Sequence, residues 1–224
     1  DLSLRGANSV VEDEKGFIWI SSKTGVLRLT GDNSKKYTLP YKTADVITVD
    51  LVYSHSQLLA YTNNGQIFKY DPVYDEFIFL LDLRDILDDI HVVVHNILIG
   101  DEGTYYIATS IGLYKYGDDE ELALLSSSGQ DELDTEWYDN EHMFLGRPEG
   151  LWLMNIKTGE SELLHESGPD ESIYVSDLFF DHGKERLWIG TNSGDLFFYD
   201  TNDQVLSASG ISNLPNQPVL DMEV

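Results

Sequence analysis

The sequence predicts an all-β chain built from a repeating unit of four short antiparallel strands. Two observations support this: a strand–turn–strand pattern recurs five times, and several strand-like runs are apolar on both faces. The clearest copy runs from Leu187 to Asp200, where two strand-like segments flank a polar turn that contains Gly194. A repeat of about 40–50 residues made of short strands is typical of a β-propeller blade. We therefore expect a β-propeller of four-stranded antiparallel blades.

One glycine anchors each copy of the repeat. The five glycines are Gly25, Gly65, Gly112, Gly150 and Gly194. Six residues before them stand large apolar or aromatic residues, which are Trp19, Leu59, Tyr106, Phe144 and Trp188. Three residues before the glycine, four copies have Ser or Thr and one has Arg147. Glycine suits this position because a tight hairpin turn often requires a positive φ, which glycine adopts without steric cost.

Five blades and the beginning of a sixth can be placed along the chain. The expected blades lie at about 7–40, 48–83, 94–126, 133–166 and 175–210, with a sixth inner strand at 218–224. Apolar runs such as Ile97–Ile99 fit sheets that are covered on both sides. A helix is expected from Leu83 to Val92, in the connection between the second and third blades. Residues 1–6 could form the outer strand of a further blade.

The chain therefore reads as an open arc of five blades, a fragment of a larger propeller with about seven. Residues 1–6 and 219–224 could supply an outer and an inner strand of one blade, but its two middle strands would be missing. Strands lie about 4.8 Å apart, so these two could not pair directly. Apolar blade faces left uncovered would favour self-association.

Composition excludes several functions. The 224 residues contain 14 Lys and Arg against 40 Asp and Glu, a formal net charge of −26. This balance disfavours binding to nucleic acids or anionic membranes. There is no Cys, so disulfides and thiolate metal sites are absent, and the six His show no metal-ligand spacing. We expect no cofactor and no metal. No catalytic motif stands out, although paired carboxylates leave glycosidase chemistry open.

The fourth copy departs most from the repeat. Counting back from its hairpin residue Asp139, Glu136 stands where the other inner strands have Val10, Leu51, Leu98 and Leu178. Trp137 and Tyr138 follow it, and Arg147 replaces the usual hydroxyl. Aromatic faces stack on sugar rings, and Arg can bind the carboxylate or sulfate of an acidic sugar. The candidate ligand-binding residues are thus Glu136, Trp137, Tyr138 and Arg147. The alternative is a diverged blade with an internal Glu–Arg pair or a shifted strand register.

The segment Val10 to Val26 resembles the two-component regulator propeller repeat. In that family an inner strand ends in Asp, a Gly turn leads to a Trp-Ile-Gly-Thr-like strand, and a second turn leads to a Leu-Tyr-Arg-Tyr-like strand. Trp188 to Thr191 matches the second of these elements, and Leu113 to Tyr116 matches the last. The first, third and fifth copies are the clear ones, and the resemblance covers essentially the whole chain.

The resemblance implies a non-catalytic sensor. Such repeats are typical of the periplasmic domain of hybrid two-component system histidine kinases, which are anchored in the inner membrane and usually sense oligosaccharides from complex glycans. The implied partners are an oligosaccharide ligand, the rest of the same kinase and a second copy in a homodimer. Two alternatives stay open: a propeller enzyme of the lyase or hydrolase kind, and a propeller that serves only as a dimerisation scaffold. Propellers host many functions.

Overall fold

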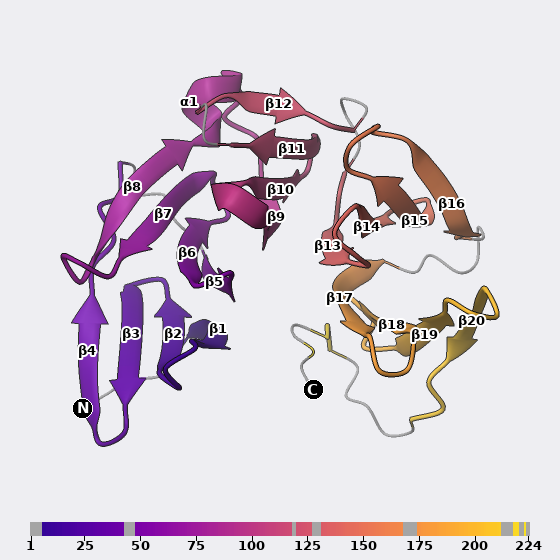
Figure 1. Ribbon diagram of the computed structural model, residues 1–224, viewed down its shortest axis with the longest axis horizontal. Coiled ribbons are helices and arrows are strands. Elements are labelled where there is room, and N and C mark those ends of the chain that lie inside the picture. Colours follow the sequence, from indigo (N-terminus) through magenta and orange to yellow (C-terminus); the bar gives the residue numbers. More distant parts are fainter. Residues whose placement is uncertain are drawn as a thin grey trace. The chain divides into compact units, whose positions relative to one another are not determined.

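The computed structural model describes residues 6–42, 48–117, 120–126, 131–167, 174–211, 217–219 and 222. Five four-stranded antiparallel sheets account for its strands, and in each sheet the strands are ordered as they occur in the chain (Figure 1). The chain is a β-propeller of four-stranded blades, as the repeat predicted. We number the blades one to five along the sequence.

The strand bounds follow the repeat closely. Blade one contains β1 (Ala7–Glu12), β2 (Ile18–Ser22), β3 (Gly25–Thr30) and β4 (Asn33–Tyr37). Blade two contains β5 (Val49–Ser54), β6 (Gln57–Thr62), β7 (Gln66–Asp71) and β8 (Glu76–Asp82). Blade three contains β9 (Val94–Ile99), β10 (Tyr105–Thr109), β11 (Gly112–Tyr116) and β12 (Leu122–Leu124).

The remaining two blades have the same construction. Blade four contains β13 (Asp134–Trp137), β14 (His142–Arg147), β15 (Gly150–Asn155) and β16 (Ser161–Glu166). Blade five contains β17 (Val175–Asp181), β18 (Arg186–Thr191), β19 (Leu196–Asp200) and β20 (Val205–Ala208).

The expected helix between blades two and three is shorter than the sequence indicated. Helix α1 spans Leu83–Leu87, and the carboxylate of Asp82 caps it by accepting the backbone N–H of Arg84. It ends because Asp88 adopts a left-handed conformation with φ 52°, which breaks the helical path. A 3₁₀ turn, η1 (Asp101–Gly103), joins β9 to β10.

The anchor glycines have the backbone conformation that the turn requires. Gly25 and Gly150 have φ of 126° and 143°. A Cβ on Gly150 would lie 2.0 Å from the carbonyl oxygen of His165, and one on Gly25 would lie 2.3 Å from that of Tyr37. Glycine is needed here for a second reason as well, because the carbonyl of the outer strand approaches the turn too closely for any side chain.

The hydroxyl three residues before the glycine closes the same turn. The Thr191 hydroxyl accepts the backbone N–H of Asp195 at 2.9 Å, and the Thr62 hydroxyl accepts that of Gln66 at 2.9 Å. The Thr109 hydroxyl accepts the backbone N–H of Ile111, two residues on, at 3.2 Å and donates to the carbonyl of Gly112 at 2.7 Å. The preference for Ser or Thr at this position is therefore a turn-capping preference.

Each sheet has two faces, and blades one and two pack against each other through opposite faces. We call the face turned towards the preceding blade the leading face and the other one the trailing face. In blade one, Val11, Trp19 and Arg28 are in register on the trailing face. In blade two, Leu51, Ala60 and Phe68 are in register on the leading face. Trp19, Leu51, Ala60 and Phe68 belong to one buried core cluster.

Blades four and five pack in the same way. The trailing face of blade four carries Phe144, which is 1% exposed, and the leading face of blade five carries Leu178 and Ile189. These residues form a second buried cluster. Because side chains alternate between the two faces of a strand, the strand register determines which neighbouring blade each side chain contacts.

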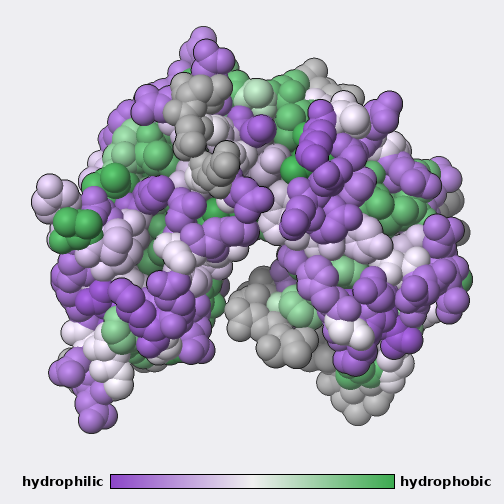
Figure 2. Space-filling view, in the orientation of Figure 1, coloured by the Kyte–Doolittle hydropathy of each residue, from purple (hydrophilic) through white to green (hydrophobic). Residues whose placement is uncertain are grey.

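The chain forms two compact units. One comprises residues 1–106 and 116–122, and the other comprises residues 107–115 and 123–224. Hydrophilic residues dominate the visible surface, and smaller hydrophobic patches are scattered among them (Figure 2). Within the described residues, no helix combines the length and apolar character that a membrane crossing needs.

Part of the expected sixth strand falls within the described residues. Val219 donates its backbone N–H to the carbonyl of Thr191 at 3.2 Å and accepts the Ser176 hydroxyl at 2.7 Å. Its side chain covers Gly190 as Val175 covers Gly146 one blade earlier. Val219 thus occupies the position that the alignment with Val175 gave it, whereas residues 1–5 and most of 220–224 lie outside the described residues.

Candidate ligand-binding site

The inner strand of blade four does not have the register that the sequence suggested. Glu136 pairs with Phe144, as Phe179 pairs with Trp188 and Val52 with Leu59. Thr135, and not Glu136, therefore takes the position of Leu51 and Leu178 in the other blades. The predicted equivalence of Glu136 with those leucines is wrong by one residue.

The length of the first hairpin explains the error. Asp139 lies three residues after Glu136, but Asp181 lies two residues after Phe179. Counting back from the hairpin Asp consequently shifts the alignment by one position in blade four. A one-residue shift moves a side chain to the other face of the sheet. Glu136 therefore belongs to the trailing face, which blade five covers.

The four predicted site residues lie on two opposite faces of blade four. Glu136 and Tyr138 are on the trailing face, where the Tyr138 ring packs edge-on against Phe144 and Phe180 at centroid distances of 5.3 Å. Trp137 and Arg147 are on the leading face. The structure thus brings Glu136 and Tyr138 to one side and leaves Trp137 and Arg147 on the other. The four do not form one site.

Arg147 forms a buried ion pair inside the protein. Its Nε and Nη2 donate to the two carboxylate oxygens of Glu132 at 2.8 and 2.9 Å. The side chains of Arg147 and Glu132 are 4% and 0% exposed, and the guanidinium lies 5.1 Å from the ring centroid of Trp152. This matches the alternative interpretation of an internal Glu–Arg pair, with Glu132 as the acid. Because the guanidinium is buried and bonded to Glu132, it does not bind the charged group of an acidic sugar.

Glu132 is a buried partner of Arg147 that the sequence did not reveal. It lies in the connection before β13, and its backbone N–H bonds to the carbonyl of Thr109 in blade three. The only signal for it was the replacement of a turn-capping hydroxyl by Arg147. A buried guanidinium needs a paired carboxylate, and its position along the chain cannot be derived from a spacing rule.

Three acidic residues lie along the contact between β13 and β17, the inner strands of blades four and five. We call Asp134, Glu136 and Asp177 the acidic seam. Asp134 Oδ2 accepts the backbone N–H of Leu178 at 2.6 Å and so links β13 to β17. Glu136 and Asp177 are half-buried and close enough to repel each other electrostatically.

The surroundings of Glu136 keep its carboxyl group protonated at neutral pH. Burial, the largest cause, and the negative charge of Asp177 together raise the pKa of Glu136 from 4.5 to about 8, although the backbone N–H of Trp137 opposes the rise. A protonated carboxyl beside a carboxylate offers one hydrogen-bond donor and several acceptors. This combination suits the hydroxyl groups of a neutral polyol and repels anions.

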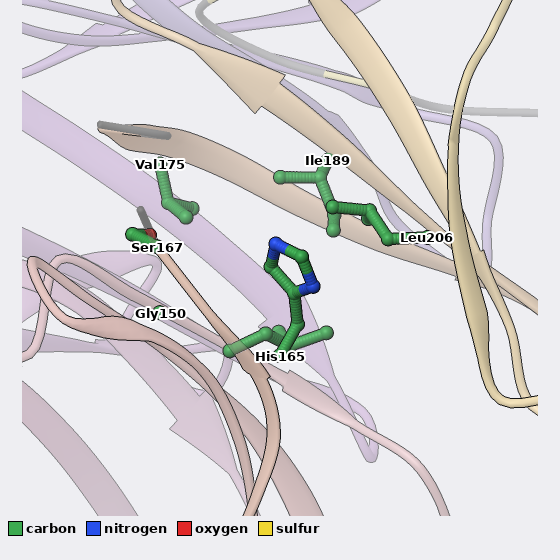
Figure 3. A pocket seen from close by; sticks show the side chains of 7 residues that line it. Gly150, His165, Ser167, Val175, Ile189 and Leu206 are labelled. Carbon is green, nitrogen blue, oxygen red and sulfur yellow. The ribbon is translucent and has the colours of Figure 1, made fainter. Parts of the chain in front are cut away.

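A small pocket lies elsewhere between the same two blades. Leu151, Val175, Ile189 and Leu206 line it, and the His165 ring points between them (Figure 3). Its volume is about 230 Å³, open space at the mouth included, which is below the usual size of a ligand pocket. His165 Nε2 and Ser167 Oγ are buried there without a hydrogen-bond partner among the described residues. Two orphan polar atoms in an apolar crevice fit an ordered water better than a ligand.

Among the described residues, no three side chains of His, Cys, Asp or Glu are arranged so that they could hold a metal ion. His142 is held by Asp139 and Asn155 at a blade-four hairpin. These contacts stabilise the hairpin and leave no open coordination position.

Comparison with solved structures identifies proteins of the same architecture. The extracellular domain of the proposed hybrid two component system BT4673 from B. thetaiotaomicron matches with a TM-score of 0.68 and 21% identity. The corresponding domain of BT3049 from the same organism matches with a TM-score of 0.67 and 14% identity. The chain shares its fold with these extracellular domains. The match covers 92% of this chain in both cases, so the fold expected from the repeat is confirmed over nearly all of it.

The same fold also occurs outside signal transduction. PorZ, a surface component of the type-IX secretion system of Porphyromonas gingivalis, matches with a TM-score of 0.69 and 14% identity over 94% of this chain. The chain spans about 30% of the length of these solved proteins. No family model and no curated relative matches the sequence.

Proposed function

We propose that this chain is part of the extracytoplasmic sensor domain of a hybrid two-component system, where it binds a ligand without catalysing a reaction. The observation that carries the proposal is the shared fold with extracellular domains of such systems over 92% of the chain. The repeat motifs of blades one, three and five support it independently. In this setting the domain lies in the periplasm and signals to a histidine kinase in the same protein.

The ligand that best fits the acidic seam is a neutral oligosaccharide. Protonated Glu136 and ionised Asp177 supply a donor and acceptors for sugar hydroxyls. Arg147 is buried against Glu132, and the chain carries a charge of −26, so a sulfated or uronic-acid sugar would meet repulsion. A glycan-derived neutral oligosaccharide that regulates polysaccharide utilisation is therefore the proposed signal.

Calorimetry on the purified chain tests this proposal. A panel of neutral oligosaccharides should include a binder, and matched sulfated sugars should not bind. Glu136→Leu should weaken the binder at least about tenfold, because it removes both hydrogen-bonding oxygens, whereas Glu136→Gln should retain most of the affinity. Glu160→Gln, at an exposed acid of the same unit, is the control.

The outcomes separate the site from the function. Binding that survives Glu136→Leu rejects the acidic seam as the site. Binding by the intact ectodomain but not by this chain places the ligand elsewhere in the protein. If neither binds any glycan, the sensing proposal fails.

A propeller enzyme is the second candidate, and the acidic seam is the observation that favours it. A carboxyl group with a raised pKa beside an ionised carboxylate is the arrangement that glycosidases use as acid and base or nucleophile. Turnover of a polysaccharide panel by the purified chain, abolished in Glu136→Gln, would establish it. Inactivity on the whole panel rejects it.

A further inference from the structure

The carboxylate of Asp75, in the hairpin between β7 and β8, is held by four side chains from blades one and two. Tyr37 and Tyr70 donate their hydroxyls to Asp75 Oδ1 at 2.7 and 2.5 Å. Arg28 Nη1 lies 3.1 Å from the same oxygen, and Lys35 Nζ lies 2.5 Å from Oδ2. We call Arg28, Lys35, Tyr37 and Tyr70 the donor cluster. Cations and hydroxyl donors that converge on one carboxylate are the groups from which proteins build anion sites.

The blade-one part of the donor cluster is fixed by the sheet and by aromatic rings. Arg28 pairs with Lys35, and Tyr37 lies two residues beyond Lys35, so the three side chains share the trailing face. The Arg28 guanidinium lies 5.2 Å from the ring centroid of Trp19 and 5.4 Å from that of Tyr37. These contacts do not involve Asp75, so the donor groups should stay in place when its carboxylate is removed.

The donor cluster and its carboxylate have complementary protonation states. Desolvation alone would raise the pKa of Asp75, but hydrogen bonds from the Lys35 ammonium and the two tyrosine hydroxyls hold it well below its usual range. Burial, followed by the hydrogen bond to Asp75, raises the pKa of Tyr37. The carboxyl group is therefore ionised and the phenol protonated at neutral pH, as a carboxylate site requires.

Asp75 does not use the donor cluster fully. Arg28 donates through Nη1 to Asp75 and to the Tyr70 hydroxyl, whereas its Nε is buried without a hydrogen-bond partner among the described residues. A carboxylate placed edge-on to a guanidinium takes two N–H groups. Asp75 also has φ 54°, a left-handed conformation that is costly for a residue other than glycine. A free carboxylate in the same place would relieve both costs.

We propose that the donor cluster is a carboxylate-binding site that Asp75 occupies, and that a short free carboxylate takes its place when the β7–β8 hairpin opens. The group seated in the site is the CH₂–COO⁻ of an aspartate, whose free counterpart is acetate. Val73 and Tyr74, at the tip of the same hairpin, are 83% and 75% exposed, so the tip can move without unburying them. The proposal is independent of the acidic seam, which lies in blades four and five.

Thermal unfolding of the Asp75→Gly variant in sodium acetate is the first test. This change empties the site, and glycine adopts the left-handed conformation without strain, so the variant should fold. The reference is NaCl at equal ionic strength, because the formal charge of −26 makes anion binding depend on salt. Acetate should raise the melting temperature of the variant, and neutral acetamide should not.

Asp71→Ala is the matched control in the same hairpin. It removes the carboxylate that accepts the backbone N–H of Val73 at 2.8 Å, but it leaves Asp75 in the donor cluster. This variant should show no shift that is specific to acetate.

Two further variants test the role of the guanidinium and the need for an empty site. Arg28→Lys combined with Asp75→Gly keeps the charge but lacks the fork of N–H groups, and acetate should bind it at least about tenfold more weakly in a calorimetric titration. Asp75→Asn fills the site with a neutral group, so its response to acetate should be smaller than that of Asp75→Gly. Circular dichroism of each variant checks that it is folded.

Hydrogen exchange of the wild type tests the opening of the hairpin and needs no variant. Asp75 competes with free acetate at a high effective concentration, so more acetate is needed than for Asp75→Gly. Backbone amides of residues 71–76 should then exchange faster in acetate than in NaCl of equal ionic strength.

Three results would overturn the proposal. Folded Asp75→Gly could gain no stability that is specific to acetate. Asp71→Ala could gain as much as Asp75→Gly does. The hairpin of the wild type could exchange equally in acetate and in NaCl, which would show that Asp75 is a permanent part of the cluster.

Discussion

The carboxylate of Asp134 accepts the backbone N–H of Leu178 at 2.6 Å, which ties the inner strand of blade four to that of blade five. Ser9 makes the equivalent bond to the backbone N–H of Leu51 at 2.8 Å between blades one and two. Asp134 lies two residues before Glu136, which pairs with Phe144. Ser9 likewise lies two residues before Val11, which pairs with Trp19. A short polar side chain at this inner-strand position is therefore a recurrent link between blades.

Removing this link should destabilise the fold. Asp134→Ala leaves the buried N–H of Leu178 without an acceptor, and we expect the free energy of unfolding to fall by about 1–3 kcal/mol. Asp134→Asn should lose less, because its amide oxygen can still accept. Asp203→Ala, at an exposed aspartate of the same unit, should change little. Urea unfolding of the three variants measures the differences, and equal losses in Asp134→Ala and Asp203→Ala would refute the link.

The buried pair of Arg147 and Glu132 yields a second prediction. Arg147→Thr introduces the hydroxyl residue of the other copies but leaves the buried Glu132 carboxylate without its partner. We expect the free energy of unfolding to fall by about 3–5 kcal/mol. Glu132→Val combined with Arg147→Thr should recover most of it, because no uncompensated charge remains. Thermal and urea denaturation of both single variants and the double variant gives the coupling energy. Additive losses in the double variant would contradict the pairing.

The sequence predicted the fold well because each blade encodes its own turn. The anchor glycine, the hydroxyl before it and the large residue at Trp19 or Trp188 each have a local physical reason, and these reasons repeat. The fourth blade showed where the repeat fails. The identity of the buried partner could not be read from the sequence, because Glu132 meets Arg147 only through tertiary packing.

The candidate site was predicted less well for two physical reasons. Alternation places adjacent residues on opposite faces, so the run Glu136-Trp137-Tyr138 could never act as one surface while it remains a strand. Hairpin length then decided which face each residue joined. Asp177 could not be connected with Glu136 from sequence alone, because the two are neighbours only after blades four and five pack.

The acidic seam predicts a pH dependence of stability with a definite sign. The pKa of Glu136 is about 8 in the folded state and near 4.5 when unfolded. The folded protein therefore binds the proton more tightly, and this contribution is complete below pH 4.5 and lost as the pH rises through 8. Glu136→Gln mimics the protonated form and should remove that loss.

Thermal unfolding of the wild type and Glu136→Gln between pH 5 and pH 9 is the measurement. The melting temperatures should be similar at pH 5, and the variant should be clearly more stable at pH 9. Glu160→Gln controls for the general effect of removing one negative charge. Parallel curves for the wild type and Glu136→Gln would show that Glu136 titrates normally.

Gly146 and Gly190 allow the packing of consecutive inner strands to be tested in two places. An added Cβ would lie 2.8 Å from Val175 Cγ1 at Gly146 and 2.6 Å from Val219 Cβ at Gly190. Neither glycine has a positive φ, so alanine is disfavoured here by crowding alone. Gly146→Ala should lower the free energy of unfolding by about 1–3 kcal/mol because the added methyl group overpacks the contact.

Gly190→Ala should cost a similar amount only if Val219 packs as the first residue of a further inner strand. Shortening the chain after residue 211 removes that neighbour, and Gly190→Ala should then become nearly neutral, while Gly146→Ala should keep its full cost. Urea denaturation of both variants in the full and shortened chains provides the four values. If Gly190→Ala costs the same in both backgrounds, the crowding does not come from Val219, and the similarity of this contact to that of Val175 with Gly146 would have no energetic consequence.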